Sequence, residues 1–554
     1  MYWSGSRNEY LGAGEETTTV LFVCLDDWFL TAEERGNDAS GIDQRASKRQ
    51  AWTEGNQLRV LVDGSTYFSR LIAVCDSLGE GDQLRFTDWR GDGDEMMQEG
   101  GPSIAQLVSD SSRRGVDVRV LLWRSHSDRL AFSAKENRRL AAEVAAAGGE
   151  AVLDNRVRRG GSHHQKLVIA RRAAAPEQDV AFVGGIDLSH GRRDDRAHRG
   201  DQQSVEMNPR YGERPPWHDV QLEIRGPAVA DLDFTFQERW RDPTPLNHSG
   251  LARAWSSRLL KQDRVGTPLA EPFAPPPPKG DAAVQVLRTY PKRHPRYPFA
   301  PDGERSIARA FAKAVARART LIYIEDQYLW STDVAHILAS ALRRHPKLQL
   351  IVVLPRFPDK DGRFSGPPAR LAQSRVLEIL RQAGGDRVGV YDLENSSGSP
   401  VYVHAKVCVI DDVWVSVGSD NLNRRSWTHD SEVSCAVIDS HIDTRAPQDP
   451  GGLGDLSRSF ARDVRLRLWA EHLWREIDDP ALVPLKGAVR FWDSLTQQTA
   501  PGGHENKDIG KTSHLRIHEV EPVNGLTRLW AEVLYRLLFD PDGRPLSLRL
   551  RRHF

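Results

Sequence analysis

Short apolar runs rich in valine and isoleucine alternate with longer stretches in which apolar residues recur every three or four positions. The short runs are typical of buried β-strands, and the longer period is typical of amphipathic helices. Strands that alternate with helices along a chain predict an α/β fold, in which helices flank mixed sheets.

The same order of runs occurs twice along the chain. Three apolar runs of the first half have counterparts in the second: 59–62 with 284–287, 84–89 with 321–326, and 118–123 with 348–354. A Gly-Gly pair, which is typical of a helix end, follows in each half. We therefore predict two similar α/β halves packed around a pseudo-two-fold axis, with a cleft between them.

A proline-rich segment separates the halves and is typical of a semi-rigid linker, because proline resists helix and sheet interiors. The predicted division has five parts: an N-terminal extension at 1–54, the first half at 55–250, the linker at 251–282, the second half at 283–485, and a C-terminal tail at 486–554.

Each half carries a His-x-Lys sequence that leads into an apolar run. His164 and Lys166 form the first, and His404 and Lys406 form the second. Both sequences, with the apolar runs that follow them, are predicted to be β-strands. Residues two apart on a strand share a face, so we expect each histidine to lie beside its lysine. His163 has the opposite parity and is interpreted as structural.

Position 171 differs between the two copies. Asp411 follows the second apolar run, whereas Arg171 stands at the matching place in the first. On strand parity Asp411 points away from His404, so we expect neither Arg171 nor Asp411 to take part in catalysis.

A second apolar run follows each motif and ends in small and polar residues. Gly185 and Asp187 end it in the first half, and Ser419 and Asn421 end it in the second. Lysine ammonium groups and hydroxyl or amide groups bind phosphate oxygens, and glycine allows a close backbone approach. Two histidines can act as a nucleophile and a general acid, because imidazole titrates near neutrality. The combined set predicts a phosphodiester-cleaving site.

Composition narrows the partners and the compartment. The 554 residues carry 76 basic and 76 acidic side chains, and this zero formal charge disfavours a bulk nucleic-acid binder. The four cysteines are scattered, so neither a disulfide framework nor a metal site is expected. No signal peptide and no long apolar run is apparent, which predicts a cytoplasmic or peripheral membrane protein. No obligate protein partner is inferred.

At these motifs the sequence resembles the phospholipase D superfamily, whose signature is a doubled His-x-Lys-x4-Asp, and in particular its eukaryotic-type branch in a compact bacterial-like form. The stretches that carry the resemblance are 162–166, 182–188, 216–220, 322–328 and 418–426. Arg171 departs from the signature. The resemblance implies a two-step reaction without metal or other cofactor, so we expect activity to survive chelation.

By position, the resemblance also implies residue roles. His164 would be the nucleophile that becomes phosphohistidine, and His404 would be the general acid. The matching phosphate-binding positions are Lys166, Lys406, Asn421 and Ser419. Asp219 and Glu432 match carboxylates that orient the histidines, with Asp430 as the alternative to Glu432.

The predicted function is a phospholipase D that acts on phospholipid at a membrane surface and releases phosphatidic acid and a headgroup alcohol. A phosphatidyl transferase of the cardiolipin-synthase kind is the first alternative, although no N-terminal membrane helices are apparent. A nuclease or other phosphodiesterase is the second, and a non-catalytic binding protein is the third.

Overall fold

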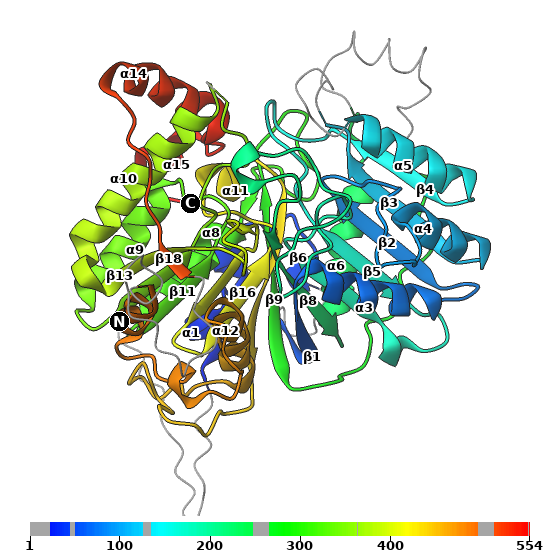
Figure 1. The fold of residues 1–554 in the computed structure, drawn as a ribbon. Coiled ribbons are helices and arrows are strands. Elements are labelled where there is room, and N and C mark those ends of the chain that lie inside the picture. Colours follow the sequence, from blue (N-terminus) through cyan, green and yellow to red (C-terminus); the bar gives the residue numbers. More distant parts are fainter. Residues whose placement is uncertain are drawn as a thin grey trace, which may run out of the picture.

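A single mixed sheet of 16 strands runs through both halves of the molecule (Figure 1). This structure is a computed structural model, and it describes residues 23–44, 50–125, 134–246, 265–362, 364–496, 515–551 and 553–554. None of the helices in these ranges is both long and apolar enough to cross a membrane.

The first half contributes seven strands to the sheet. They are β1 (Thr53–Val62), β2 (Gln83–Asp88), β3 (Asp117–Trp123), β4 (Glu150–Asp154), β5 (Leu167–Arg171), β6 (Val180–Gly184) and β8 (Val220–Arg225). From the centre of the molecule outward the order is β1, β8, β6, β5, β2, β3, β4. The outer three strands are parallel to one another, and the inner pairings are antiparallel.

The second half repeats this arrangement. Its strands are β9 (Ala282–Tyr290), β11 (Leu321–Glu325), β12 (Gln349–Val353), β13 (Val388–Leu393), β15 (Val407–Ile410), β16 (Trp414–Gly418) and β17 (Glu432–Asp439). From the centre outward the order is β9, β17, β16, β15, β11, β12, β13, and β9 pairs antiparallel with β1. The equivalent strand orders and the antiparallel central contact confirm the predicted pair of halves and their pseudo-two-fold relation.

Four further strands complete the sheets. β18 (Leu515–Ile517) extends the outer edge beside β13, and β10 (Glu304–Arg305) pairs with β9. A separate two-stranded parallel sheet joins the halves, because β7 (Trp217–His218) of the first half pairs with β14 (Tyr402–Val403) of the second.

Helices cover both faces of the sheet, as the apolar stripes of their sequences predict. One face carries a core that continues through both halves beneath α6 (Ala228–Trp240), α12 (Ser459–His472) and α13 (Ala488–Thr496). On the other face the first half is covered by α3 (Gly64–Asp76), α4 (Ile104–Arg113) and α5 (Ala134–Ala146). The second half is covered there by α8 (Ser306–Arg317), α9 (Thr332–Arg344) and α10 (Gly366–Gly384).

The segments outside the two repeats pack mainly against the second half. The short helices α1 (Leu25–Trp28) and α2 (Ala32–Arg35) lie beside α8, and Trp28 and Phe29 join the core of the second half. Near the C-terminus, α14 (Gly525–Leu534) packs on α10 and continues as a π-helical turn (Tyr535–Phe539), followed by α15 (Leu546–Arg551). α11 (Arg424–Thr428) follows β16. The predicted domain boundaries remain predictions, and residues 251–264 of the predicted linker lie outside the described residues.

Candidate active site

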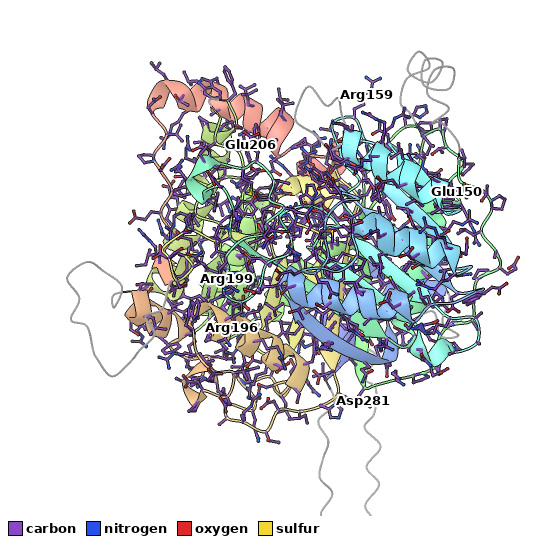
Figure 2. All side chains as sticks on the ribbon, turned by 45° about the vertical axis from the view of Figure 1, so that its right-hand side comes forward. Glu150, Arg159, Arg196, Arg199, Glu206 and Asp281 are labelled. Atoms are coloured by element: carbon purple, nitrogen blue, oxygen red, sulfur yellow. The ribbon has the colours of Figure 1, made fainter. Side chains whose placement is uncertain are left out.

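Both His-x-Lys sequences lie just before a strand rather than within it. β5 begins at Leu167 and β15 at Val407, so the prediction that the histidines belong to these strands is wrong. Because β5 is antiparallel to β2, and β15 to β11, the motifs lie beside the carboxyl ends of β2 and β11. Figure 2 places Arg159, shortly before the first motif, at the end of the molecule opposite Asp281, which precedes β9.

Short parallel pairings between the halves position each histidine. In the second half, His404 follows β14 and its N–H donates to the carbonyl of His218, 2.8 Å away. In the first half, His163 forms a parallel bridge with Ser431, and the His164 N–H donates to the Ser431 carbonyl at 2.9 Å. Asp219 and Glu432 follow His218 and Ser431, so each carboxylate is carried to the histidine of the opposite half.

The histidines and carboxylates therefore pair across the two halves. His404 Nδ1 lies 2.6 Å from Asp219 Oδ2, and His164 Nδ1 lies 2.9 Å from Glu432 Oε2. Asp430, the alternative to Glu432, instead accepts from the Ser162 N–H and pairs with Arg425. A carboxylate that accepts from Nδ1 places the lone pair of the neutral ring on Nε2.

Burial and positive charge keep both imidazoles neutral. Burial and the charges of Lys166 and Lys406 lower the pKa of His164 well below its ordinary value. Burial and the charges of Lys406 and Arg192 lower the pKa of His404 well below its ordinary value, and the charge of Lys166 adds to this lowering. Each lysine thus acts on the histidine of the other half, so the two motifs share one site. The side chain of His164 is 15% exposed and that of His404 is 5% exposed, so His164 is the more accessible.

Glu432 is held in place by a hydrogen bond from Ser419. The Ser419 hydroxyl donates to Glu432 Oε2 at 2.6 Å, and it accepts from the Val433 N–H. Burial and the charge of Asp430 raise the pKa of Glu432 to about 8. In this structure Ser419 therefore contacts the carboxylate that holds His164, and its predicted contact with phosphate stays a prediction.

The two lysines have different surroundings. Lys166 Nζ lies 3.2 Å from Asp187 Oδ1, so Asp187 pairs with a lysine of the site. Lys406 Nζ donates to Gln327 Oε1 at 3.3 Å and to the carbonyl of His404. Burial lowers the pKa of Lys406 to about 8.

Asp187 carries a negative charge beside Lys166. Burial alone would raise its pKa, but the charges of Lys166 and Arg192 bring the pKa of Asp187 below its ordinary value. Burial and the neighbouring Asp187 raise the pKa of Asp88, at the end of β2, well above its ordinary value. A neutral Asp88 can donate to Asp187, whereas two charged carboxylates would repel.

Gly185 and Ser419 directly follow the equivalent strands β6 and β16, and Asp187 and Asn421 stand two residues further on. A Cβ at Gly185 would lie 2.0 Å from Asp219 Oδ1, so only glycine allows that carboxylate to take its place beside His404. Asn421 is buried, and its Oδ1 has no hydrogen-bond partner among the described residues. A buried amide oxygen without a partner is available to a hydrogen-bond donor.

Arg171 and Asp411 lie away from the histidines because they stand at the opposite ends of β5 and β15. Arg171 is buried and pairs with Asp179 at 2.5 Å and Asp233 at 3.1 Å. Asp411 accepts backbone N–H groups of residues 319–321 at 2.7–2.8 Å. Both side chains hold loops at the ends of strands. The replacement of the signature aspartate by Arg171 therefore changes contacts within the fold and leaves the histidine–carboxylate pairs unchanged.

Several neighbours of the site were not singled out from the sequence. Trp217 packs against His404 with ring centroids 5.1 Å apart, and Trp89 lies edge-on to His164 at 6.2 Å. Asp88, the last residue of β2, contacts Asp187, and Gln327, two residues after the equivalent strand β11, contacts Lys406. Their position directly after repeated apolar runs is the signal that could have identified them.

Comparisons with known proteins agree with this arrangement. A sequence model of the family described as phospholipase D matches residues 94–265, and one described as "Cardiolipin synthase, PLD-like domain" matches residues 311–447. Each match contains one His-x-Lys motif. The chain belongs to the phospholipase D superfamily.

Plant proteins are among its curated relatives. Phospholipase D alpha 2 of Oryza sativa subsp. japonica is 25% identical over 53% of this chain and 46% of its own length. Phospholipase D gamma 3 of Arabidopsis thaliana is 26% identical over 71% of this chain and 59% of its own length. The chain thus spans about half the length of the curated relatives that it matches. A solved phosphatidylserine synthase of Haemophilus influenzae aligns at 15% identity over 70% of this chain and 83% of that one, with a TM-score of 0.46.

Proposed function

We propose that this protein is a phospholipase D-type phosphodiesterase that cleaves the distal phosphodiester of glycerophospholipids to phosphatidic acid and a headgroup alcohol. The observation that carries the proposal is the pair of neutral imidazoles in one site, each held at Nδ1 by a carboxylate of the opposite half. This arrangement supplies one nucleophile and one proton-transfer group without further reagents.

In the first step, Nε2 of His164 attacks phosphorus. The bond between phosphorus and the headgroup oxygen breaks, and that oxygen takes a proton from Nε2 of His404. The bound phosphodiester brings negative charge beside His404, which favours the imidazolium form that the ring needs as an acid. His164 is the better nucleophile because its side chain is the more exposed of the two.

In the second step, His404 takes a proton from water, and the resulting hydroxide attacks phosphorus. The bond to His164 Nε2 breaks and phosphatidic acid leaves. Lys166 and Lys406 neutralise the phosphoryl oxygens in both steps, and Asn421 donates its amide to one of them.

A membrane surface is the proposed location of the substrate, and the C-terminal helix supports it. Exposed apolar side chains follow one face of α14 and its π-helical continuation: Leu526, Leu529, Val533, Leu537 and Leu538. Arg528 and Arg536 alternate with them and are exposed. Apolar residues flanked by arginines are typical of helices that lie in the interface of an anionic membrane.

The alternative is a phosphatidyl transferase, in which an alcohol replaces water in the second step. The match of the second half to a cardiolipin synthase domain favours it. The first step would be unchanged, so the same histidines would be required.

A substrate panel tests the proposal. Vesicles of phosphatidylcholine, phosphatidylethanolamine and phosphatidylglycerol, and a single-stranded DNA, are incubated with the protein, with and without a primary alcohol. We expect phosphatidic acid from a phospholipid and none with His164→Ala. Phosphatidyl alcohol as the main product would support the transferase, and cleavage of DNA alone would refute both lipid functions.

A further inference from the structure

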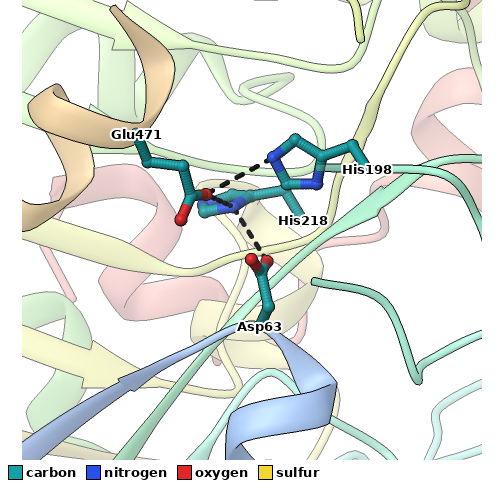
Figure 3. Close-up of side chains that lie close together, drawn as sticks. All are labelled: Asp63, His198, His218 and Glu471. Carbon is teal, nitrogen blue, oxygen red and sulfur yellow. Dashed lines mark ion pairs between the residues drawn. The ribbon is translucent and has the colours of Figure 1, made fainter. Parts of the chain in front are cut away.

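Four buried side chains close to His404 converge on one point (Figure 3). Asp63 lies between β1 and α3, His198 in a loop, His218 on β7 and Glu471 on α12. Their nearest nitrogen and oxygen atoms all lie within 4.8 Å of one another. His218 Nδ1 is 2.9 Å from Glu471 Oε1 and 3.3 Å from Asp63 Oδ1, and His198 Nε2 is 3.4 Å from Glu471 Oε1.

These four atoms are close but not hydrogen-bonded. Each of the four facing atoms is buried and has no hydrogen-bond partner among the described residues: Asp63 Oδ1, His198 Nε2, His218 Nδ1 and Glu471 Oε1. Donors and acceptors at such distances would normally point at each other. Ligands of one tetrahedral ion instead point at its centre and, with bonds of about 2.0–2.1 Å, lie about 3.3 Å apart.

The other ring nitrogen of His198 and of His218 already has a hydrogen-bond partner. His198 Nδ1 lies 3.0 Å from the Trp217 carbonyl, and His218 Nε2 lies 2.8 Å from Glu325 Oε2. A ring that donates its outer N–H to a carbonyl or carboxylate presents the lone pair of its other nitrogen, which is the usual arrangement of a metal-bound histidine. Glu325 is fixed in turn by His472 and by the Tyr323 hydroxyl.

We propose that Asp63, His198, His218 and Glu471 bind one divalent transition-metal ion, with Zn²⁺ as the best fit. Imidazole nitrogens and carboxylate oxygens are both zinc ligands, and two of each complete the four-coordinate shell that zinc prefers, whereas calcium prefers oxygen ligands alone. The ion would also balance two carboxylates buried side by side. No sequence motif marks this site, because the four ligands come from distant parts of the chain.

The ion would affect catalysis by fixing the position of His404. His218 precedes Asp219, which holds His404, and the His218 carbonyl accepts the His404 N–H. Fixing His218 therefore fixes both contacts of His404. Asp63 has φ of 64° and ψ of 154°, a conformation rare for a residue other than glycine, and a metal bond would offset its strain. These four residues are positioning residues, and the proposed reaction remains metal-independent at phosphorus.

Metal content tests the proposal directly. The full chain is produced in zinc-supplemented medium and dialysed against metal-free buffer, and bound metals are measured by mass spectrometry. We expect one zinc ion per chain. Glu471→Gln should lose more than about tenfold in zinc affinity. The matched control Glu476→Gln, an exposed glutamate beyond the same helix, should keep the ion.

Cobalt substitution provides a second readout if Glu471→Gln does not fold. Wild-type protein exchanged with Co²⁺ should show the visible absorption bands of a four-coordinate ion and a higher Tm than the metal-free protein. Substoichiometric zinc in the wild type, together with an unchanged Tm and no cobalt bands, would overturn the proposal and leave a network of protonated histidines and carboxylates. Full zinc content in Glu471→Gln would also overturn it.

Discussion

Asp219 of the first half and His404 of the second are joined by a contact of 2.6 Å between Oδ2 and Nδ1. Glu432 of the second half holds His164 of the first in the equivalent way. Each half therefore supplies the orienting carboxylate for the histidine of the other, and neither half contains a complete site. A change that moves one carboxylate should disable the opposite motif.

Gly185→Ala tests the space beside Asp219. The new Cβ would lie 2.0 Å from Asp219 Oδ1 and must displace that carboxylate from His404. We expect kcat to fall by about a hundredfold, because a displacement of about 1 Å in a catalytic group can have that effect. Steady-state kinetics and circular dichroism would show a folded but impaired protein. Gly79→Ala, which meets no atom within 4 Å, should keep wild-type kcat, and a normal rate in both variants would contradict the argument.

The pH dependence of kcat/KM should report Glu432. Below its raised pKa of about 8, the Glu432 carboxyl is protonated and can donate to His164 Nδ1, which leaves the ring proton on Nε2 and blocks attack. Above that pKa the carboxylate accepts from Nδ1 and frees Nε2. We therefore expect kcat/KM to rise with pH up to about 8.

Glu432→Gln should remove this rise and lower the rate, whereas Glu476→Gln should leave the profile unchanged. A profile with the same inflection in Glu432→Gln would assign the titration to another group, such as Lys406, whose pKa is also about 8.

Arg171→Ala should reduce stability and leave chemistry intact. The substitution leaves Asp179 and Asp233 buried without their shared partner, and removing one member of a buried ion pair typically costs about 3–5 kcal/mol. Urea unfolding should show that loss, while kcat of the folded protein stays near wild type. Arg171→Asp should be at least as destabilised. The exposed Arg113→Ala is the control for unfolding, and a large fall in kcat at unchanged Tm would place Arg171 in the reaction.

Apolar residues of α14 should matter only at a membrane. Leu529 and Val533 are 73% and 54% exposed, so Leu529→Ser/Val533→Ser should not disturb the core. We expect the double variant to bind anionic vesicles several-fold more weakly and to turn them over more slowly, since less apolar area enters the interface. Its rate on a short-chain, monomeric phospholipid should equal that of wild type. Equal vesicle binding by both proteins would exclude this face as the membrane contact.

The sequence predicts the parts of the structure that repeat. Apolar runs recur in the same order along the two halves, so the α/β class and the pair of similar halves follow from the sequence. The motif histidines are recognisable from the same repeat, whereas Asp219 and Glu432 are recognisable only from the resemblance to the phospholipase D superfamily. Their cross-pairing is not, because it depends on the parallel pairing of β7 with β14 and on the bridge between His163 and Ser431. Those contacts arise only when the halves meet.

The sequence also predicts an earlier start for β5 and β15 than the structure shows. Each His-x-Lys sequence leads directly into an apolar strand, but the backbone N–H groups of His164 and His404 donate to backbone carbonyls of the opposite half instead of joining that strand. The cluster of Asp63, His198, His218 and Glu471 has no characteristic spacing along the sequence. Tertiary contacts between distant segments decide both features.

The central claim is that His164 forms the covalent intermediate while His404 handles protons. Intact-protein and peptide mass spectrometry of His404→Ala, mixed with the p-nitrophenyl ester of a short-chain phosphatidic acid, tests it most directly. p-Nitrophenolate leaves without a general acid, whereas hydrolysis of the intermediate still needs the base. The account predicts a burst of p-nitrophenolate, one phosphatidyl adduct per chain on His164, and neither burst nor adduct in His164→Ala. An adduct on another residue, or turnover by His164→Ala, would contradict it.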